Sequence, residues 1–395
     1  NFIIGFLAAI WRGQTVLLPP NRSPDVTQSL LADYPDSSCL TDTDRLPGDM
    51  RNSAEIMLYD YAAAKPGSIN EVPLIDSSQL ACMVFTSGST GKPTANAKFW
   101  GDLVQGTALI QSRYDIGQDD YLVATVPPQH MYGLETTILL PMMSAASVYG
   151  GMPFFPQDIC RTLALSAKPA TLITTPLHLR VCVQAELSWP VLRQVISATA
   201  HLGQEEAVQV QQLFKVGLRE IYGSTESGAI ASRNTADNKK WHLYDGVRLY
   251  QENGDMEGSM RVIARHLPHR PLLADRVESI DDEHFLMHGR SSDMIKIAGK
   301  RASMSGLNHR LNSIPGIEDG VFVQNESHSG EVSRLCVVFV SAELSPADVI
   351  KALGQQIDPV FLPRPVFKVA TLPRNEIGKL PHLEMKKLLG KLMDQ

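Results

Sequence analysis

Short apolar segments rich in β-branched residues alternate with helical patterns over the first 290 residues. Buried strands separated by helices are typical of α/β proteins with largely parallel sheets. Two of the helical stretches are Ala97–Tyr114 and Glu205–Leu213, and a hairpin turn is expected at Glu252–Asp255. The predicted strands are Thr15–Leu18, Leu80–Thr86, Tyr121–Val126, Ser147–Tyr149, Thr171–Thr174, Gln194–Ala198 and Val216–Tyr222. We therefore predict a large α/β domain with several sheets.

The balance of basic and acidic residues changes near Arg290. Residues 290–395 hold 14 basic and 11 acidic residues, whereas the rest of the chain holds 22 and 31. Helices are predicted there over Gly306–Ser313 and Pro346–Gln356, strands over Gly320–Gln324 and Leu335–Ser341, and a proline-rich strand entry over Pro359–Val369. The pattern predicts a small α+β domain over 291–395 behind a large domain over 1–290.

Composition excludes several classes of protein. With 36 basic and 42 acidic residues the net charge is −6, which gives no electrostatic footprint for nucleic acid or an anionic membrane. A content of 44% hydrophobic and 20% charged residues excludes disordered, collagen-like and coiled-coil chains. The five cysteines are scattered without a CxxC pair, which favours a reducing, cytoplasmic setting. The apolar run Phe2–Trp11 predicts a helix too short for a bilayer, which needs about 20 residues.

The strongest chemical signal is the segment Val84–Thr94, an apolar strand that runs into a glycine- and hydroxyl-rich loop. Glycines let backbone N–H groups approach an anion closely, and the hydroxyls add donors, so the loop suits a polyphosphate. A Walker A loop is excluded because only two residues separate its glycines and Pro93 follows the lysine. The candidate phosphate-binding residues are Thr86, Ser87, Gly88, Ser89, Thr90, Gly91 and Lys92.

Three further motifs follow in order: Tyr222–Glu226 (YGSTE), Gly289–Lys296 (GRSSDMIK) with Gly299 after it, and Pro373–Lys379 (PRNEIGK). Together with the glycine-rich loop they resemble the core motifs of the adenylate-forming superfamily, which includes acyl-CoA synthetases, peptide-synthetase adenylation domains and luciferases. The resemblance implies a large adenylate-forming domain with a small, mobile C-terminal domain. It also implies two steps: a carboxylate reacts with Mg-ATP to give an acyl adenylate, and a thiol then forms a thioester.

The resemblance assigns roles residue by residue. The loop Thr86–Lys92 would hold the β- and γ-phosphates, Thr225 would contact the α-phosphate, and Glu226 would bind Mg²⁺. Lys379 would bridge the carboxylate and the α-phosphate. Tyr222 would stack on or flank the adenine, Gly223 and Ser224 would also bind the nucleotide, and Asp275 and Arg290 would lie at the ribose. His130 would lie at the acyl pocket and Gly299 at the thiol tunnel.

Three features depart from the family pattern. Ser292 stands at the hinge position, where the family often has Asp or Lys. The segment Ala198–His201 replaces a Gly-Gly-Ala-Pro stretch, which suggests a smaller acyl pocket for a small aryl or short acyl acid. The glycine-rich loop comes early in the chain, so the N-terminal part of the large domain is expected to be truncated.

The prediction is an AMP-forming acid–thiol ligase of fatty or aryl acid metabolism, with ATP, Mg²⁺ and coenzyme A as cofactors. Phosphopantetheine on an acyl carrier protein is the alternative acceptor, favoured by the basic small domain. A luciferase-like oxidative enzyme and a non-catalytic nucleotide-binding paralogue are further alternatives. The expected partners are a small carboxylic acid and, for the second acceptor, a carrier protein, with no nucleic acid and no membrane span.

Overall fold

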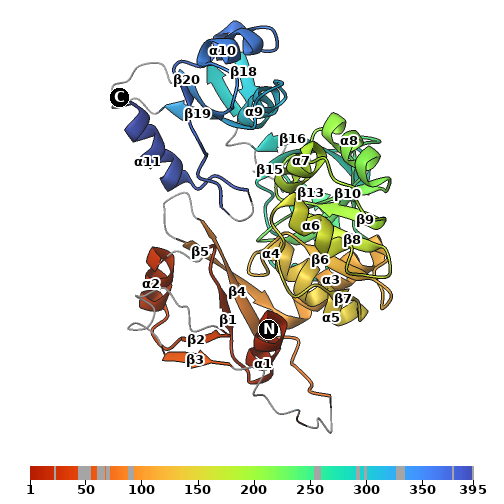
Figure 1. Ribbon diagram of the computed structural model, residues 1–395. Coiled ribbons are helices and arrows are strands. Elements are labelled where there is room, and N and C mark those ends of the chain that lie inside the picture. The colour runs from red at the N-terminus through yellow and green to blue at the C-terminus, as the bar shows by residue number, and fades with distance from the viewer. Residues whose placement is uncertain are drawn as a thin grey trace. The chain divides into compact units, whose positions relative to one another are not determined.

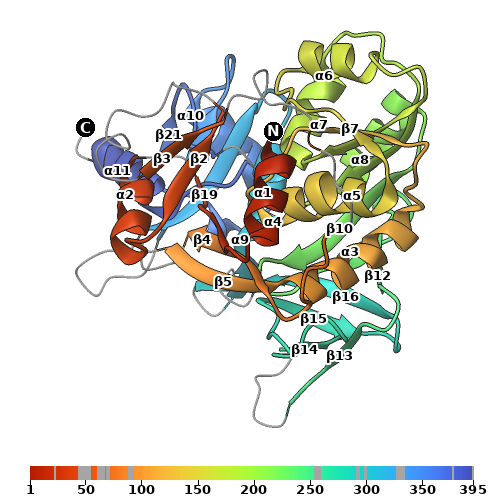
Figure 2. The same ribbon diagram turned by 90° about the horizontal axis from the view of Figure 1, so that it is seen from below.

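The computed structural model describes residues 1–21, 24–42, 55–59, 67, 72–87, 93–252, 259–290, 294–297, 300–325, 334–375 and 378–393. These residues form two compact units. The first comprises Asn1–Arg248 and Val262–Pro271, and the second comprises Leu249–Arg261 and Leu272–Gln395. Figures 1 and 2 show the helices and strands of both units. The domain boundary predicted after residue 290 stays a prediction.

The first unit is built around parallel strands in the order β10-β9-β8-β6-β7, to which β11 and β12 add antiparallel pairs. β8 is buried at every position because it is a continuous run of apolar and β-branched residues, as a strand covered on both faces requires. The strands are β6 (Tyr121–Ala124), β7 (Ser147–Val148), β8 (Ala170–Thr174), β9 (Leu192–Ser197), β10 (Leu218–Ser224), β11 (Gly228–Arg233) and β12 (Trp241–Leu243). The predicted α/β class with parallel strands is confirmed.

Helices cover this sheet in two groups (Figure 2). The first group packs through one hydrophobic cluster on β6, β8, β9 and β10; it consists of α6 (Pro156–Leu163), α7 (Pro176–Gln184) and α8 (Gln204–Phe214). The second group includes α3, which contacts β11; it consists of α3 (Trp100–Tyr114), α4 (Met131–Gly133), the π-helix η2 (Leu134–Leu139) and α5 (Leu140–Ser144).

A smaller sheet, ordered β1-β4-β5, precedes these elements and shares a core with α3 and η2. Its strands and the neighbouring elements are α1 (Phe2–Trp11), β1 (Val16–Leu18), α2 (Pro24–Asp33), β2 (Ser38–Thr41), β3 (Glu55–Leu58), β4 (Leu80–Ser87) and β5 (Pro93–Phe99). The predicted helix over Phe2–Trp11 is confirmed. The predicted helix start at Ala97 is wrong, because Ala97–Phe99 pair with β4 as part of β5 and the helix begins at Trp100.

The second unit has its own core, formed by α9, α10 and the sheet β19-β20-β21. Its elements agree in type with those predicted for the C-terminal part. They are β15 (Asp275–Ser279), β16 (His284–Arg290), β17 (Met294–Ile297), β18 (Lys300–Ser303), α9 (Met304–Asn312), β19 (Asp319–Asn325), β20 (Arg334–Val340), α10 (Pro346–Gly354), η4 (Pro359–Phe361), β21 (Val366–Lys368) and α11 (His382–Met393). The chain passes between the units at β13 (Arg248–Tyr250) and β14 (Arg261–Ile263). Of the predicted hairpin turn, Asn253–Asp255 lie outside the described residues.

Candidate functional site

The carboxyl ends of β6, β8, β9 and β10 meet at one edge of the large sheet, because these strands run parallel to one another. Hydrogen bonds join the residues that end them: Thr125 Oγ1 lies 2.8 Å from Thr174 Oγ1, and the Ala198 N–H donates to Thr174 O at 3.4 Å. Ligands of open α/β sheets bind beyond the carboxyl ends of the strands. This carboxyl edge is therefore the candidate site.

The turn between β10 and β11 carries Thr225 and Glu226 at this edge. Ser224 and Ser227 close the turn reciprocally: the Ser224 N–H donates to Ser227 Oγ at 3.1 Å, and the Ser227 N–H donates to Ser224 Oγ at 3.2 Å. Thr225 is half-buried and Glu226 is exposed. The predicted phosphate and metal contacts thus fall on a turn whose geometry is fixed by its own hydrogen bonds.

Tyr222 precedes this turn and is held by packing from below. Tyr222 is 8% exposed, and the centre of its ring lies 5.4 Å from the centre of the Trp241 ring. The guanidinium carbon of Arg233 lies 4.4 Å from the centre of the same Trp241 ring. Arg233 in turn forms an ion pair of 2.6 Å with buried Glu220. The ring of Tyr222 thus packs at a tilt of 50° against Trp241, and its predicted contact with adenine remains a prediction.

The segment after β6 carries His130, which is half-buried and stands directly before α4. Two contacts fix the helical turn beside it. The Tyr132 hydroxyl donates to Ile196 O at 3.1 Å, and a Cβ on Gly133 would lie only 2.1 Å from Pro127 O. The backbone next to His130 is therefore closely packed. The role of His130 at an acyl pocket remains a prediction.

The segment after β9 contains a strained residue, Thr199, with a φ of +82°. Positive φ is the left-handed region that glycine adopts easily and that a β-branched residue rarely adopts. The hydroxyls of Thr199 and Ser197 are also buried without a hydrogen-bond partner among the described residues. Thr199 replaces a glycine of the Gly-Gly-Ala-Pro stretch of the family that the chain resembles. Its backbone nevertheless has the positive φ that is typical of glycine.

We expect Thr199→Gly to raise the free energy of unfolding by about 1 kcal/mol, since it relieves the backbone strain and removes the unpartnered hydroxyl. Urea unfolding of the two proteins measures this difference. Thr199→Ala is the matched control, because it removes the hydroxyl and keeps the strain, so its gain should be smaller. A Thr199→Gly variant less stable than the parent would contradict the assigned strain.

The predicted phosphate loop lies between β4 and β5. At the base of the loop, Thr86 pairs with Thr94 and Ser87 pairs with Pro93 in an antiparallel ladder. The other predicted loop residues lie outside the described part of the chain; they are Gly88, Ser89, Thr90, Gly91 and Lys92.

The predicted residues of the second unit fall on two local structures. Asp275 and Arg290 are opposite each other in the β15–β16 ladder. Lys379 ends a closed loop: its N–H donates to Asn375 Oδ1 and its carbonyl accepts from the Asn375 N–H, both at 2.8 Å. Arg374 anchors the loop through two bonds of 2.6 and 2.7 Å to the Asp319 carboxylate. Gly299 and Ser292 lie outside the described residues.

Two buried charged residues touch the Thr225–Glu226 turn and were not predicted from the sequence. Lys98 Nζ donates to the backbone carbonyl of Glu226 at 3.0 Å, and Glu135 Oε1 accepts from the Ala229 N–H at 3.1 Å. The sequence feature that could have indicated them is that each is the one charged residue of its element, Lys98 in β5 and Glu135 in η2.

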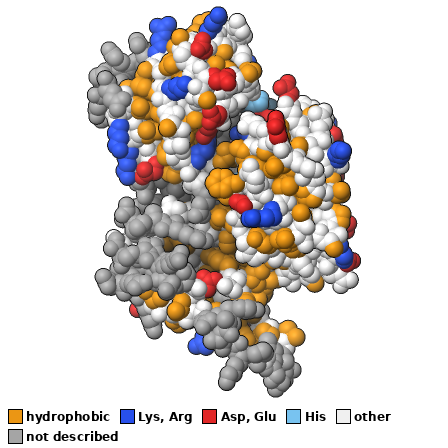
Figure 3. Space-filling view, in the orientation of Figure 1, with side chains coloured by type: hydrophobic (Ala, Val, Ile, Leu, Met, Phe, Trp, Pro, Cys, Tyr) orange, Lys and Arg blue, Asp and Glu red, His pale blue; other side chains and the backbone are white. Residues whose placement is uncertain are grey.

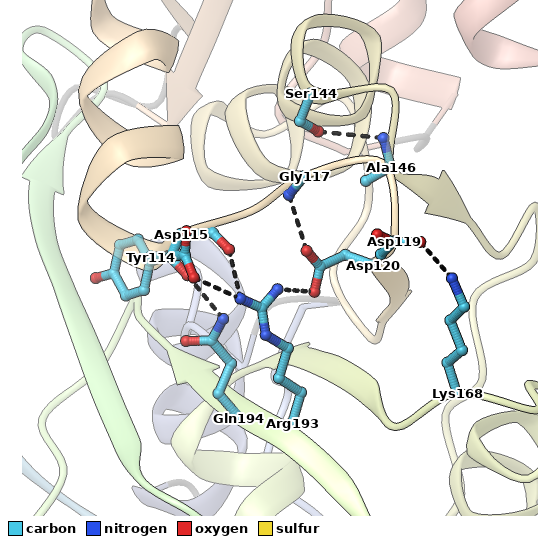
Figure 4. A network of polar contacts seen from close by, with 10 residues as sticks. All are labelled: Tyr114, Asp115, Gly117, Asp119, Asp120, Ser144, Ala146, Lys168, Arg193 and Gln194. Carbon is cyan, nitrogen blue, oxygen red and sulfur yellow. Dashed lines mark hydrogen bonds and ion pairs between the residues drawn. The ribbon is translucent and has the colours of Figure 1, made fainter.

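The opposite, amino edge of the same strands has a hollow of about 540 Å³. It is lined by residues that precede β6 and β8 and by the first residues of β9: Asp115–Asp120, Lys168, Pro169, Leu192 and Arg193. Its charges pair with one another, as Figure 4 shows: Arg193 lies between Asp115 and Asp120, and Lys168 reaches Asp119. None of the predicted site residues lines the hollow, and we interpret this network as structural.

On the face shown in Figure 3, basic and acidic side chains are interspersed. The described residues include no cluster of three or more His, Cys, Asp or Glu that could hold a metal ion by themselves. Within the same residues, every helix is too short or too polar to cross a membrane.

Comparison with known sequences gives a match to a family described as "AMP-binding enzyme" over residues 21–248. The chain is 25% identical to a 4-coumarate–CoA ligase of Halorhodospira halophila, over 81% of this chain and 80% of the ligase. It is 21% identical to tyrocidine synthase 3 of Brevibacillus parabrevis over 99% of this chain, but spans only 7% of that protein.

Comparison with solved structures supports the fold. ATP-bound MatB from Rhodopseudomonas palustris superimposes with a TM-score of 0.80 at 17% identity, over 99% of this chain and 87% of MatB. The mixed α/β architecture is thus that of known adenylate-forming enzymes.

Proposed function

Since the chain belongs to the AMP-binding enzyme family, we propose that it activates a carboxylic acid with ATP and transfers the acyl group to a thiol. In the first step a carboxylate oxygen attacks the α-phosphorus, and pyrophosphate leaves to give an acyl adenylate. In the second step the thiol sulfur attacks the acyl carbon and AMP leaves, which gives a thioester. Similarity to a 4-coumarate–CoA ligase supports this acid–thiol ligase activity.

The observation that carries the proposal is the turn at the end of β10, which holds Thr225 and Glu226 at the carboxyl edge of the parallel strands. Negative charge grows on the α-phosphate and on pyrophosphate during the first step, so catalysis depends on positioned donors and cations. The Thr225 hydroxyl is a donor to the α-phosphate. Thr86 and Ser87 end β4 at the base of the loop proposed to hold the β- and γ-phosphates.

Glu226 suits a Mg²⁺ ion that arrives with ATP. Its carboxylate is exposed and forms no ion pair with another described residue. Mg²⁺ prefers hard oxygen ligands, and ATP sites commonly supply one or two carboxylates with the phosphates completing the shell. When bound, the ion would neutralise charge on the phosphates. A single carboxylate on a fixed turn therefore fits the metal.

Lys379 is proposed to bridge the substrate carboxylate and the α-phosphate in the first step. Its loop is closed by Asn375 and anchored by Arg374 on Asp319, which supports a defined position for the ammonium group. Asp275 and Arg290 are proposed to bind the ribose. We further propose that the chain divides into domains 1–290 and 291–395, with Ser292 at the hinge and the Gly299 segment facing the thiol after rotation.

The acid is proposed to be a small aryl or short acyl acid. Thr199 adds a side chain at a glycine-like position beside the carboxyl edge, which reduces the space beyond β9. Coenzyme A is the proposed acceptor, with Mg²⁺ as the metal. The phosphopantetheine arm of a carrier protein is the alternative acceptor, and a cytoplasmic setting is proposed for the reaction.

Carboxylate-dependent exchange between ATP and labelled pyrophosphate tests the proposal across aryl, short, medium and long acids. Exchange with an aryl or short acid is expected, because the first step is reversible on the enzyme. Thioester formation with coenzyme A or a carrier protein then identifies the acceptor. Absence of exchange with every acid, in a protein that still binds ATP, would contradict a catalytic role.

A further inference from the structure

A buried cation and a buried carboxyl bond to the backbone of the turn that carries Thr225 and Glu226 and of the strand that follows it. Lys98 is 8% exposed and reaches the turn from β5 through its 3.0 Å bond to the Glu226 carbonyl. Glu135 is 5% exposed and reaches it from η2 through its 3.1 Å bond from the Ala229 N–H. Side chains from β5 and η2 thus bond to backbone groups only three residues apart, at Glu226 and Ala229.

Both groups are buried at an electrostatic penalty. Burial lowers the pKa of Lys98, and the nearby charge of Glu135 is the largest influence that opposes this shift. Burial raises the pKa of Glu135 to about 7. Charged groups are rarely buried unless they are paired or bonded, and an apolar pair of similar volume is often at least as stable. Stability alone therefore explains the two residues poorly.

The fit between Glu135 and the turn is close. Gly228 has a φ of +64°, and a Cβ there would lie 2.6 Å from Glu135 Oε1. The carboxyl group thus packs directly on the backbone of the turn. A movement of Glu135 would be transmitted to Gly228 and Ala229, and from there to Glu226.

Lys98 also connects the turn to the predicted phosphate loop. β5 begins at Pro93, directly after that loop, and Lys98 is the sixth of its seven residues. One strand therefore leads from the loop to the Glu226 carbonyl. The bond from Lys98 sets the turn at a fixed position along this strand.

We propose that Lys98 and Glu135 are positioning residues that hold Thr225 and Glu226 in the geometry required for Mg-ATP. This inference rests on the proposed adenylation function. Neither residue touches the reacting atoms; each acts through the backbone of the turn. Their loss should therefore weaken the use of Mg²⁺ specifically and should loosen the turn even when no nucleotide is present.

The test compares Lys98→Met, Glu135→Leu and Glu135→Gln with a matched control, Gln194→Met. Gln194 in β9 is also buried, and its side-chain nitrogen donates to a backbone carbonyl, Tyr114 O, at 3.0 Å. The control thus removes a similar buried bond near the amino end of β9, whereas the turn follows the carboxyl end of β10. The first readout is the Mg²⁺ concentration that gives half-maximal pyrophosphate exchange. The second is amide hydrogen exchange of the segment 222–231 without ligands.

Lys98→Met and Glu135→Leu are expected to raise the half-saturating Mg²⁺ concentration about tenfold and to speed amide exchange in the turn about tenfold, as the loss of one charge-assisted hydrogen bond implies. Glu135→Gln keeps an acceptor for the Ala229 N–H and should recover most of the difference. Gln194→Met should lower the melting temperature without either change.

The proposal is overturned if Lys98→Met and Glu135→Leu behave as Gln194→Met does, with lower stability but parental Mg²⁺ dependence and parental amide exchange. Failure of the proposed function is a distinct result. In that case the parent protein itself shows no exchange with any acid, while the amide-exchange comparison still decides whether the two residues hold the turn.

Discussion

Lys379→Ala is expected to lower adenylate formation by about 10²-fold or more, the amount that removal of one electrostatic stabiliser typically causes. The ammonium group would lose its contact with the developing charge on the α-phosphate. The loop around it should persist, because its closing bonds use backbone groups of Lys379 and the side chain of Asn375. Pyrophosphate exchange measures the first step directly.

The second step separates this role from general damage. Thioester formation from supplied acyl adenylate should remain nearly intact in Lys379→Ala. Lys391→Ala, at an exposed lysine of α11, is the matched control and should retain both steps. Equal losses in the two half-reactions of Lys379→Ala would contradict the assigned role.

Gly223→Ala is expected to disrupt the site strongly. A Cβ on Gly223 would lie 2.1 Å from Gly228 O and 2.8 Å from Gly228 C. Both are backbone atoms, so no side chain can rotate away, and β10 and β11 would have to separate. Misplacement of catalytic groups by about 1 Å can lower a rate about 10²-fold, and we expect a fall in exchange activity of at least that size.

Gly217→Ala is the control for this change. Gly217 directly precedes β10, and an added Cβ there meets nothing within 4 Å. Its free energy of unfolding should stay within about 0.5 kcal/mol of the parent, whereas Gly223→Ala should lose about 3 kcal/mol or more. A Gly223→Ala protein with parental melting temperature and activity would show that the turn can relax.

The sequence predicts the parallel strands well because their signal is local. Residues 170–174 form a continuous apolar and β-branched run, and such a run indicates a strand covered on both faces whatever its partners are. β5 was not predicted as a strand. Its seven residues include asparagine and lysine, and they run without interruption into a helical pattern. Only its pairing with β4 makes it a strand, and that pairing is a property of the tertiary fold.

The candidate site divides in the same way. The Tyr222–Glu226 motif can be recognised because its residues are adjacent in the sequence. Lys98 and Glu135 could not be recognised, since an isolated lysine in a strand is usually solvated and an isolated glutamate usually lies on the exposed face of a helix. Their burial follows from the approach of a turn more than 90 residues away in the chain.

The contact between Gly228 and Glu135 also constrains how this sequence can diverge. A Cβ at position 228 would lie 2.6 Å from Glu135 Oε1, and the φ of +64° would strain any other residue there even if a shorter side chain stood at 135. Descendants of this sequence that replace the glutamate should therefore still keep the glycine.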